Sequence, residues 1–367
     1  MEKIDKNIFR GIFNEKKVLI TGDTGFKGSW LAIWLAALGA KVYGYSLPPK
    51  SENDNFVKCG LINKITHIDG DIRDLKKLKN TLLDIKPEIV FHLAAQSLVL
   101  ESYSNPIYTF ETNIIGTVNI FEAVRQTKSV KVVINITSDK CYLNNEWVWG
   151  YKETDPLGGN DPYSASKGCS ELITNSYKNS FFNKNQNCVI ASARAGNVIG
   201  GGDWSENRIV PDFFRAIKNN KNLIIRNPNS TRPWQFILEP LSGYLNLAML
   251  IINEGRKFSG PWNFGPNIMN ETTVLTLIKK LNSKLRKGNK IIKKNNSTHE
   301  SKLLRLDISK SISQLHWKPV LDIEEMINFT MRGYLIEIEN GKIYEDRISQ
   351  IIDYTKLAMQ RKLNWAN

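Results

Sequence analysis

The chain has 367 residues, of which 41% are hydrophobic, and its 50 basic against 36 acidic side chains give a net charge of +14. This length suffices for one large domain or for a domain and a half, and the mean hydropathy of −0.31 is ordinary for a soluble globular protein. The longest apolar stretch, around Trp30–Ala40, is too short to span a bilayer.

The positive charge does not by itself indicate a nucleic-acid partner. Eight Lys or Arg lie between Lys279 and Lys294 without an acidic neighbour. Aromatic residues are not interleaved with them, as they would be in a single-strand groove, so we interpret the segment as a solvated helix and loop. An anionic small substrate would also benefit from the positive field. We expect no nucleic acid and no membrane among the partners.

Cysteine and histidine usage argues against disulfides and metals. The cysteines Cys59, Cys141, Cys169 and Cys188 show no paired spacing, and His92, inside an apolar strand, is expected to be a core residue. We therefore predict a reducing compartment and no metal site. The start of the chain lacks the apolar core of a signal peptide. We expect a cytoplasmic protein.

The first predicted strand leads into a glycine-rich turn. Lys17–Thr21 is followed by Gly22–Gly28 and then by an apolar helix that Gly39 ends. Glycines allow a pyrophosphate to approach the backbone, and the helix N-terminus offers free N–H groups. The spacing is G-x-x-G-x-x-G and not the usual G-x-G-x-x-G. The turn predicts a phosphate site for a dinucleotide.

The second strand leaves the choice of dinucleotide open. Lys41–Ser46 should end with an acid if it binds a ribose 2′-hydroxyl, but Leu47, Pro48 and Pro49 follow. No Arg is present there for a 2′-phosphate either. NAD and NADP both remain possible at this point.

The following strands and helices alternate. Strands are predicted at Ile65–Asp69, Glu88–Leu93, Lys131–Thr137 and Cys188–Ala195, with helices at Asp74–Asp84 and Thr109–Gln126. This alternation predicts a doubly wound parallel (Rossmann-like) α/β sheet with ligands at the carboxyl ends of the strands. Because Gly22–Gly28, Ala94–Ser97 and Ser138–Lys140 all follow strands, we expect them to share one site.

A Tyr and a Lys four residues apart begin the next helix. On a helix Tyr163 and Lys167 share one face. A nearby ammonium can lower the pKa of a Tyr from about 10 and make it a base for a sugar or steroid hydroxyl. The alternative is a solvated Lys beside a half-buried Tyr. The strand end Ser138–Lys140, which precedes this helix, favours the catalytic interpretation.

Beyond Ala195 the regular alternation weakens. A glycine-rich loop, Gly196–Asp203, is followed by clustered aromatic and Arg residues: Trp204, Arg208, Arg226, Arg232–Gln235 and Pro261–Asn263. They predict either a phosphate and ring site or a small satellite core with surface Arg. We expect a dinucleotide-binding domain at residues 1–198 and a smaller, C-terminal α/β domain, mainly for substrate, at residues 199–367, with interleaving of segments allowed.

The motifs together resemble a known family. The pieces Thr21–Gly28, Gly70-Asp71, His92–Ala95, Tyr163–Lys167, Arg194 with Asn197, and Arg232 resemble the extended short-chain dehydrogenase/reductases that modify nucleotide sugars. The resemblance covers roughly Glu15–Tyr334. Longer runs, Thr137–Tyr142, Trp147–Tyr151, Asp155–Gly159 and Arg232–Gln235, resemble the branch that acts on CDP-glucose. The dTDP-glucose branch carries Thr-Asp-Glu in place of Ser138-Asp139-Lys140.

The resemblance implies a 4,6-dehydration of CDP-glucose in which a hydride passes from C4 to NAD and returns at C6; NADP is not excluded. Tyr163 would take the 4-hydroxyl proton, its pKa lowered by Lys167 and the cofactor ring, and Ser138 would hydrogen-bond O4. Asp139 would protonate the leaving 6-hydroxyl if burial raises its pKa, and Lys140 would remove the C5 proton if it is neutral.

The resemblance also implies binding residues and an assembly. The cofactor would contact Gly22, Thr24, Gly25, Phe26, Lys27, Gly28, Asp71, Ile72, Leu93, Ala94, Ala95, Tyr163 and Lys167. The substrate would contact Gln96, Ser97, Asn197, Arg208 and Arg232. A homodimer, or a higher homo-oligomer, would form a four-helix interface from Thr109–Gln126 and the helix after Pro162.

Three other functions stay open. A nucleotide-sugar 4-epimerase needs Tyr163 and Lys167 with a Ser or Thr, but has no use for Asp139 and Lys140. A dehydratase of another nucleotide sugar would share most of the site. A non-catalytic NAD(P)-sensing protein typically loses the Tyr or the Lys, and this chain retains both.

Overall fold

A seven-stranded parallel sheet forms the centre of the protein. The computed structural model describes residues 4–183, 188–267, 272–285, 290–293 and 303–366. The strands are β1 (Lys17–Thr21), β2 (Lys41–Ser46), β3 (Thr66–Asp69), β4 (Ile89–His92), β5 (Val132–Ile136), β6 (Val189–Ala195) and β11 (Gly260–Phe264). Their order is β11-β6-β5-β4-β1-β2-β3, and every neighbouring pair is parallel. The predicted doubly wound sheet is confirmed, with its topological switch point between β1 and β4.

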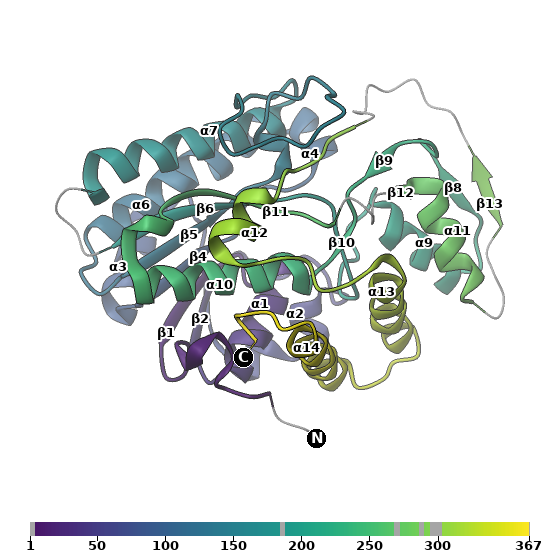
Figure 1. The fold of residues 1–367 in the computed structure, drawn as a ribbon, viewed down its shortest axis with the longest axis horizontal. Helices are drawn as coiled ribbons and strands as arrows, with labels where there is room; N and C mark the ends of the chain where they lie inside the picture. The colour runs from purple at the N-terminus through teal and green to yellow at the C-terminus, as the bar shows by residue number, and fades with distance from the viewer. Residues whose placement is uncertain (1–3, 184–187, 268–271, 286–289, 294–302, 367) are drawn as a thin grey trace.

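Helices cover both faces of the sheet (Figure 1). One face carries α3 (Leu75–Ile85), α6 (Gly116–Arg125) and α7 (Pro162–Tyr177); the other carries α1 (Phe26–Ala37), α10 (Leu238–Glu254) and α14 (Ile343–Gln360). Successive strand residues point to opposite faces, so Val18 and Ile20 of β1 join one core cluster and Leu19 joins the other. Both faces are buried, which is why the strands are continuous apolar runs.

Helix α1 follows the glycine turn and is apolar almost all round. Trp30 and Trp34 are fully buried because α10 and α14 pack against this helix. Each indole removes about 200 Å² from water, which stabilises the fold by roughly 5 kcal/mol before conformational entropy is counted. The N-terminus of α1 is thereby fixed at the end of β1.

The seventh strand was not expected from the sequence. Pro261 and Trp262 were grouped with the clustered aromatic and Arg residues, but they lie in β11 at the edge of the main sheet. Trp262 is buried, and its Nε1 donates to the Phe258 carbonyl at 2.8 Å. The run Gly-Pro-Trp-Asn-Phe lacks the β-branched residues that identify the other strands, and an edge strand tolerates its proline.

The chain after Val198 builds both a smaller lobe and part of the main body. The lobe lies to one side of the sheet in Figure 1. It contains α9 (Ile209–Lys218), β8 (Leu223–Ile225), β9 (Thr231–Arg232), β12 (Thr272–Thr273), α11 (Val274–Ser283), β13 (Ile291–Lys293) and α13 (Ile323–Ile338). Parts of the basic segment, residues 286–289 and 294, lie outside the described residues. Because β11 and α10 return to the main sheet and α14 packs against α1, the segments interleave.

Short elements connect these layers. They are α2 (Asn55–Lys58), α4 (Val99–Ser104), α5 (Pro106–Phe110), β7 (Val198–Ile199), β10 (Gln235–Phe236) and α12 (Ser309–Leu315). The helix expected at Thr109–Gln126 consists of α5, a π-helical segment at Glu111–Ile115 and α6. Parallel pairing of β7 with β10 brings the glycine-rich loop after β6 beside the segment that contains Arg232.

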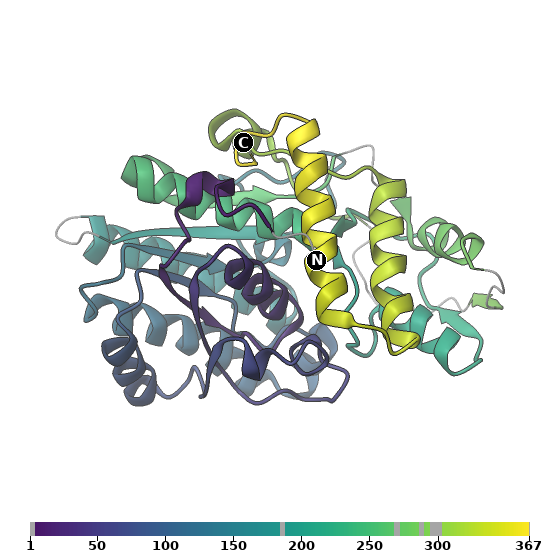
Figure 2. The ribbon, with the colours of Figure 1, turned by 90° about the horizontal axis from the view of Figure 1, so that it is seen from below.

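The two last long helices lie side by side (Figure 2). Arg347 of α14 is fully buried between them and bonds Glu337 of α13, and its Nε donates to Asn55 at 3.1 Å. Near the C-terminus, Trp365 stacks on Phe9 at 5.0 Å between ring centroids. These contacts tie the end of the chain to its beginning. Within the described residues, none of the helices has both the length and the apolar character that crossing a membrane requires.

Candidate active site

Three strand ends meet at the switch point of the sheet. Gly22 has a φ of +79°, and a Cβ placed on it would lie 2.8 Å from the backbone nitrogen of Ala94. The glycine turn after β1 is therefore packed against the segment after β4. Since β5 is the next strand along, Ser138 and Asp139 follow at the same edge. The structure thus brings the three predicted strand-end segments to one edge.

The glycine turn fits a dinucleotide. A Cβ on Gly28 would lie 2.0 Å from the carbonyl oxygen of Gly22, so the turn closes only with glycine at this position. Gly25 is the N-cap of α1 and provides no side-chain cap. The first N–H groups of α1 are therefore left for another acceptor, and a pyrophosphate is the acceptor that such a terminus favours.

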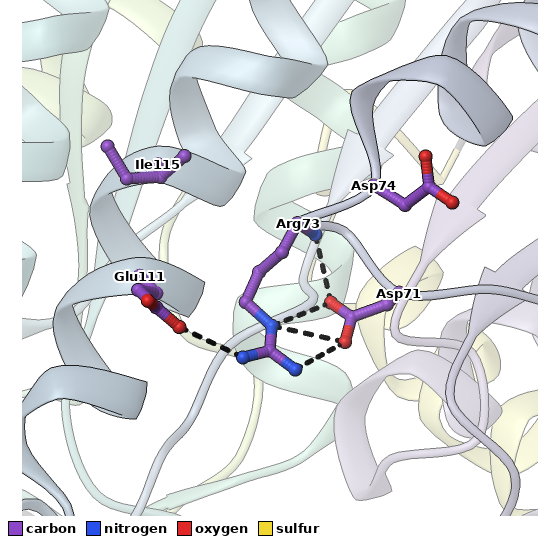
Figure 3. A pocket seen from close by; sticks show the side chains of 5 residues that line it. All are labelled: Asp71, Arg73, Asp74, Glu111 and Ile115. Carbon is purple, nitrogen blue, oxygen red and sulfur yellow. Dashed lines mark hydrogen bonds and ion pairs between the residues drawn. The ribbon is translucent and has the colours of Figure 1, made fainter.

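Asp71, predicted as a cofactor contact, lines a cavity of about 420 Å³ between the loop after β3 and the π-helical segment (Figure 3). Arg73 Nη2 donates to Asp71 at 2.7 Å, and its Nη1 donates to Glu111 at 3.0 Å. The hydrogen bonds from Arg73 to Asp71 lower the pKa of this carboxyl. Arg73 therefore orients Asp71 and connects it to the segment before α6. Ile72, the neighbouring prediction, is buried against Gly116.

Ser138 and Asp139 form a buried pair at the end of β5. Ser138 Oγ donates to Asp139 Oδ1 at 2.9 Å and accepts from the Lys140 backbone N–H at 3.2 Å. Burial raises the pKa of Asp139, although Lys140, Lys27 and Arg232 oppose that rise. The predicted role of Asp139 as an acid requires that burial raise its pKa, and in the structure burial does raise it.

Tyr163 and Lys167 lie in the first turns of α7 and are both buried. The helix begins at Pro162, and its N-cap Asp161 accepts from the Ser164 N–H at 2.9 Å. Burial lowers the pKa of Lys167 to about 8. It raises the pKa of Tyr163 to about 12 because desolvation of the phenolate outweighs the hydrogen bond with Ser138. The lowering expected for Tyr163 is therefore not a property of the protein alone.

Glu171, which the sequence analysis did not single out, bonds α7 to residues of the sheet and its strand ends. Its Oε1 accepts from Thr137 Oγ1 at 2.5 Å, and its Oε2 accepts from Ser192 Oγ at 2.7 Å and from Arg194 Nη2 at 2.8 Å. The carboxylate and the guanidinium are almost fully buried. The signal in the sequence was the spacing, since Glu171 is four residues after Lys167 on the same helical face.

Cations converge on Asp139. The ammonium of Lys27, in the glycine turn, is close enough to Asp139, Lys167 and Arg208 to interact with all three, and burial lowers its pKa to about 8. Arg208 also interacts with Tyr163. Asp139 interacts with Lys140, Lys27 and Arg232. The positive charges of Lys167 and Arg208 also repel the Lys27 ammonium, and an anionic ligand would relieve that repulsion. Lys27, predicted as a cofactor contact, therefore also lies close to the predicted acid Asp139.

The predicted substrate residues differ in their surroundings. Arg208 Nη1 donates to the buried Asp203 at 2.9 Å, and Arg232 is buried in β9. Asn197 is half-buried, and its carbonyl accepts from the Gln235 N–H at 3.0 Å. A Cβ on Gly196 would lie 3.0 Å from Asp139 Oδ2, so this loop also covers the acid.

Gln96 and Ser97, both predicted to contact the substrate, differ in their burial. Gln96 is buried, and its Nε2 donates to Thr109 Oγ1 at 2.9 Å and to the Leu98 carbonyl at 3.1 Å. Its backbone N–H donates to Asn113 of the π-helical segment at 2.9 Å. The amide thus builds the turn after β4, whereas Ser97 is exposed. The satellite-core interpretation holds for Trp234, which is buried and donates to Thr272.

The fold and the site are those of a Rossmann-like protein with a Tyr-x-x-x-Lys pair at the switch point. The family model described as GDP-mannose 4,6 dehydratase matches residues 19–330. The chain belongs to this family, within the extended short-chain dehydrogenase/reductases, as the resemblance indicated.

Individual relatives agree with this assignment. The chain is 48% identical over 356 residues to a CDP-glucose 4,6-dehydratase of Salmonella typhimurium, which covers 96% of this chain and 98% of the relative. Among solved structures, an epimerase of Methanothermobacter thermautotrophicus is similar with a TM-score of 0.77 and 24% identity over 90% of this chain and 95% of the other. The UDP-glucuronic acid 4-epimerase of Bacillus cereus, in complex with UDP-glucuronic acid and NAD, is similar with a TM-score of 0.75 and 21% identity over 87% and 99%. The two structures support the fold.

Proposed function

We propose that the protein is an NAD-dependent lyase that converts CDP-glucose to CDP-4-dehydro-6-deoxyglucose and water. The observation that carries this proposal is the buried Ser138–Asp139 pair beside Tyr163 and Lys167, in a chain similar over nearly its whole length to a CDP-glucose 4,6-dehydratase. An epimerase needs no acid for a leaving hydroxyl. An aspartate whose pKa is raised by burial is suited to that task.

Each residue has a task in this reaction. Tyr163 takes the proton of the sugar 4-hydroxyl, with Ser138 as its hydrogen-bond partner. Bound NAD supplies oxidation at C4 and reduction at C6. The ketone at C4 acidifies the C5 proton, which Lys140 removes in its neutral form, and Asp139 gives its proton to the 6-hydroxyl that leaves as water. Lys167, with a pKa of about 8, supplies a positive charge beside Tyr163 that favours its phenolate.

The nucleotide is assigned to cytidine on similarity and on one strand end. The chain is 31% identical over 243 residues to a dTDP-glucose 4,6-dehydratase of Dictyostelium discoideum, against 48% over 356 residues for the CDP-glucose enzyme. Lys140 stands where the dTDP branch carries a glutamate, so a lysine next to Asp139 in the sequence favours the CDP-glucose branch. Asn197, Arg208 and Arg232 hold the diphosphate and the nucleotide.

The direct test is a comparison of nucleotide sugars. We expect CDP-glucose to give the 4-keto-6-deoxy product, detected by mass spectrometry as loss of water, without consumption of added NAD. The same concentrations of dTDP-glucose, UDP-glucose and GDP-mannose serve as controls. Dehydration of one of these in preference to CDP-glucose would remove the cytidine assignment, and epimerisation at C4 without loss of water would remove the lyase assignment.

Asp139 and Lys140 separate elimination from the first oxidation. In Asp139→Asn and Lys140→Met, we expect dehydration to fall by about 10²–10⁴-fold because the acid or the base is missing. Tyr163 and Lys167 remain, so a 4-keto hexose that still carries its 6-hydroxyl should form and be trapped by borohydride.

Tyr163→Phe is the matched control for these two variants. It removes the first proton transfer, so neither the trapped ketone nor the dehydrated product should appear at the wild-type rate. Wild-type dehydration in both Asp139→Asn and Lys140→Met would show that the end of β5 has no part in elimination.

We further infer a homodimer from the face formed by α4, α5, the π-helical segment and α7. Apolar side chains are exposed on it: Leu100, Tyr103, Ile107, Ile115 and Leu172. Ile107 is 73% exposed and Leu172 is 59% exposed, and α5 contacts α7. An apolar cluster of this extent on packed helices is typical of an interface between subunits. A second copy of the chain would bury it as a four-helix arrangement.

Charged side chains introduced into this apolar face should dissociate the dimer. In the variant Ile107→Lys with Leu172→Lys, sedimentation equilibrium should show a monomer where the wild type is a dimer, because two ammonium groups per subunit would be buried without partners. Ile62→Lys is the control, since Ile62 is 57% exposed on a different part of the surface. A wild type that sediments as a monomer, or an unchanged dimer in the double variant, would contradict this interface.

A further inference from the structure

A buried carboxylate lies beneath the carboxyl end of β2, where the sequence has no acid. Asp23, in the glycine turn, is fully buried, and its Oδ1 accepts from Ser46 Oγ at 2.9 Å. Its Oδ2 lies 2.7 Å from His67 Nδ1 on β3. A Cβ on Gly44 would lie 2.0 Å from this Oδ2, so the glycine in β2 provides the room for the carboxylate.

His67 holds the carboxylate in place. Its Nε2 lies 3.1 Å from Asp69 Oδ1, so the imidazole bridges one buried and one exposed carboxylate. The hydrogen bond with Asp23 is the largest of the interactions that raise the pKa of His67. A buried carboxylate needs a hydrogen-bonding partner, and His67 provides one for Oδ2 of Asp23. Oδ1 is left to accept from Ser46.

The two hydroxyls at this strand end, of Ser46 and Thr24, both have acceptors within the protein for their protons. Ser46 has one O–H, and the Asp23 carboxylate at 2.9 Å is a stronger acceptor than the Leu47 carbonyl at 3.1 Å. Thr24 Oγ1 lies 2.9 Å from Ser46 Oγ and donates to the Leu47 carbonyl at 3.0 Å. Each oxygen therefore has lone pairs, and no proton, left for a ligand.

In a Rossmann-like fold the ribose of the dinucleotide is recognised at the end of this second strand. Lone pairs can accept from a 2′-hydroxyl, which has a proton to donate. A 2′-phosphate has only acceptor oxygens and negative charge, and it would face lone pairs backed by a carboxylate. We propose that Asp23, acting through Ser46, is the residue that makes this site select NAD over NADP.

This inference rests on the proposed use of a nicotinamide dinucleotide, and it answers the question that the missing acid of β2 left open. Asp23 does not touch the ribose in this arrangement; it orients the hydroxyl that does. It is therefore a positioning residue, and its effect should appear in the ratio of two affinities more clearly than in either one.

The test is a calorimetric titration of the protein with NAD and with NADP, in the absence of nucleotide sugar. In Asp23→Asn the amide can donate to Ser46 and turn its proton toward the ligand. The ratio of the NADP to the NAD dissociation constant should then fall by on the order of 10-fold or more. Ser46→Ala removes the mediating hydroxyl and should also lower the ratio, by weakening NAD binding.

Asp69→Asn is the matched control. Asp69 also interacts with His67, but its side chain is 70% exposed. Its ratio should equal that of the wild type. If Asp23→Asn does not fold, as circular dichroism would show, Ser46→Ala decides the outcome alone. An unchanged ratio in Ser46→Ala, or a wild type that binds NADP as tightly as NAD, would overturn the proposal. Since no sugar is present, either result is independent of whether CDP-glucose is dehydrated.

Discussion

The buried ion pair between Glu171 and Arg194 is the interaction on which the candidate site depends. Glu171 lies on α7 two turns after Tyr163, and it bonds side chains of β6 and of the residue that precedes Ser138. The helix with the Tyr and Lys is thereby fixed against the strand ends with the Ser and Asp. A buried pair of this kind contributes little net stability, but loss of one partner typically costs about 3–5 kcal/mol. Its value here is geometric.

Charge and burial together define what the site can do. Asp139 is kept largely from water, which favours its protonated form, while Lys27, Lys140 and Arg232 favour its ionised form. A carboxyl group under such opposing influences can hold a proton and still release it to a leaving hydroxyl. The same burial favours neutral Lys167 and neutral Tyr163. An arriving cofactor and an anionic substrate would change this balance, because their charges enter the same enclosed space.

Local patterns predicted those parts of the fold that depend on local sequence. Six strands matched to within one residue at each end because buried parallel strands are runs of apolar and β-branched residues. β11 was missed because its proline, tryptophan and asparagine do not form such a run; only its pairing with β6 identifies it. The glycine turn and the Tyr–Lys pair were predictable because each is a short motif with a fixed spacing.

The rest of the site depends on contacts between residues far apart in the chain. Glu171 bonds Thr137 and Arg194 across 34 and 23 positions, and Asp23 bonds His67 across 44. No periodicity encodes such contacts. The pKa of Tyr163 in the protein alone could not be predicted for the same reason: the spacing to Lys167 was evident, whereas the extent of burial that raises the pKa was not. The sequence also did not show that Gln96, predicted as a substrate contact, bonds Thr109 and Leu98 in the turn after β4.

The central claim is that a proton leaves C5 while Asp139 protonates the departing hydroxyl. The most direct measurement is the reaction of the wild-type protein with CDP-glucose in heavy water, with the product examined by proton NMR and mass spectrometry. The account predicts one deuterium at C5 of the 4-keto-6-deoxy sugar, because a base that exchanges with solvent returns the proton there. A dehydrated product that retains its original hydrogen at C5 would contradict it.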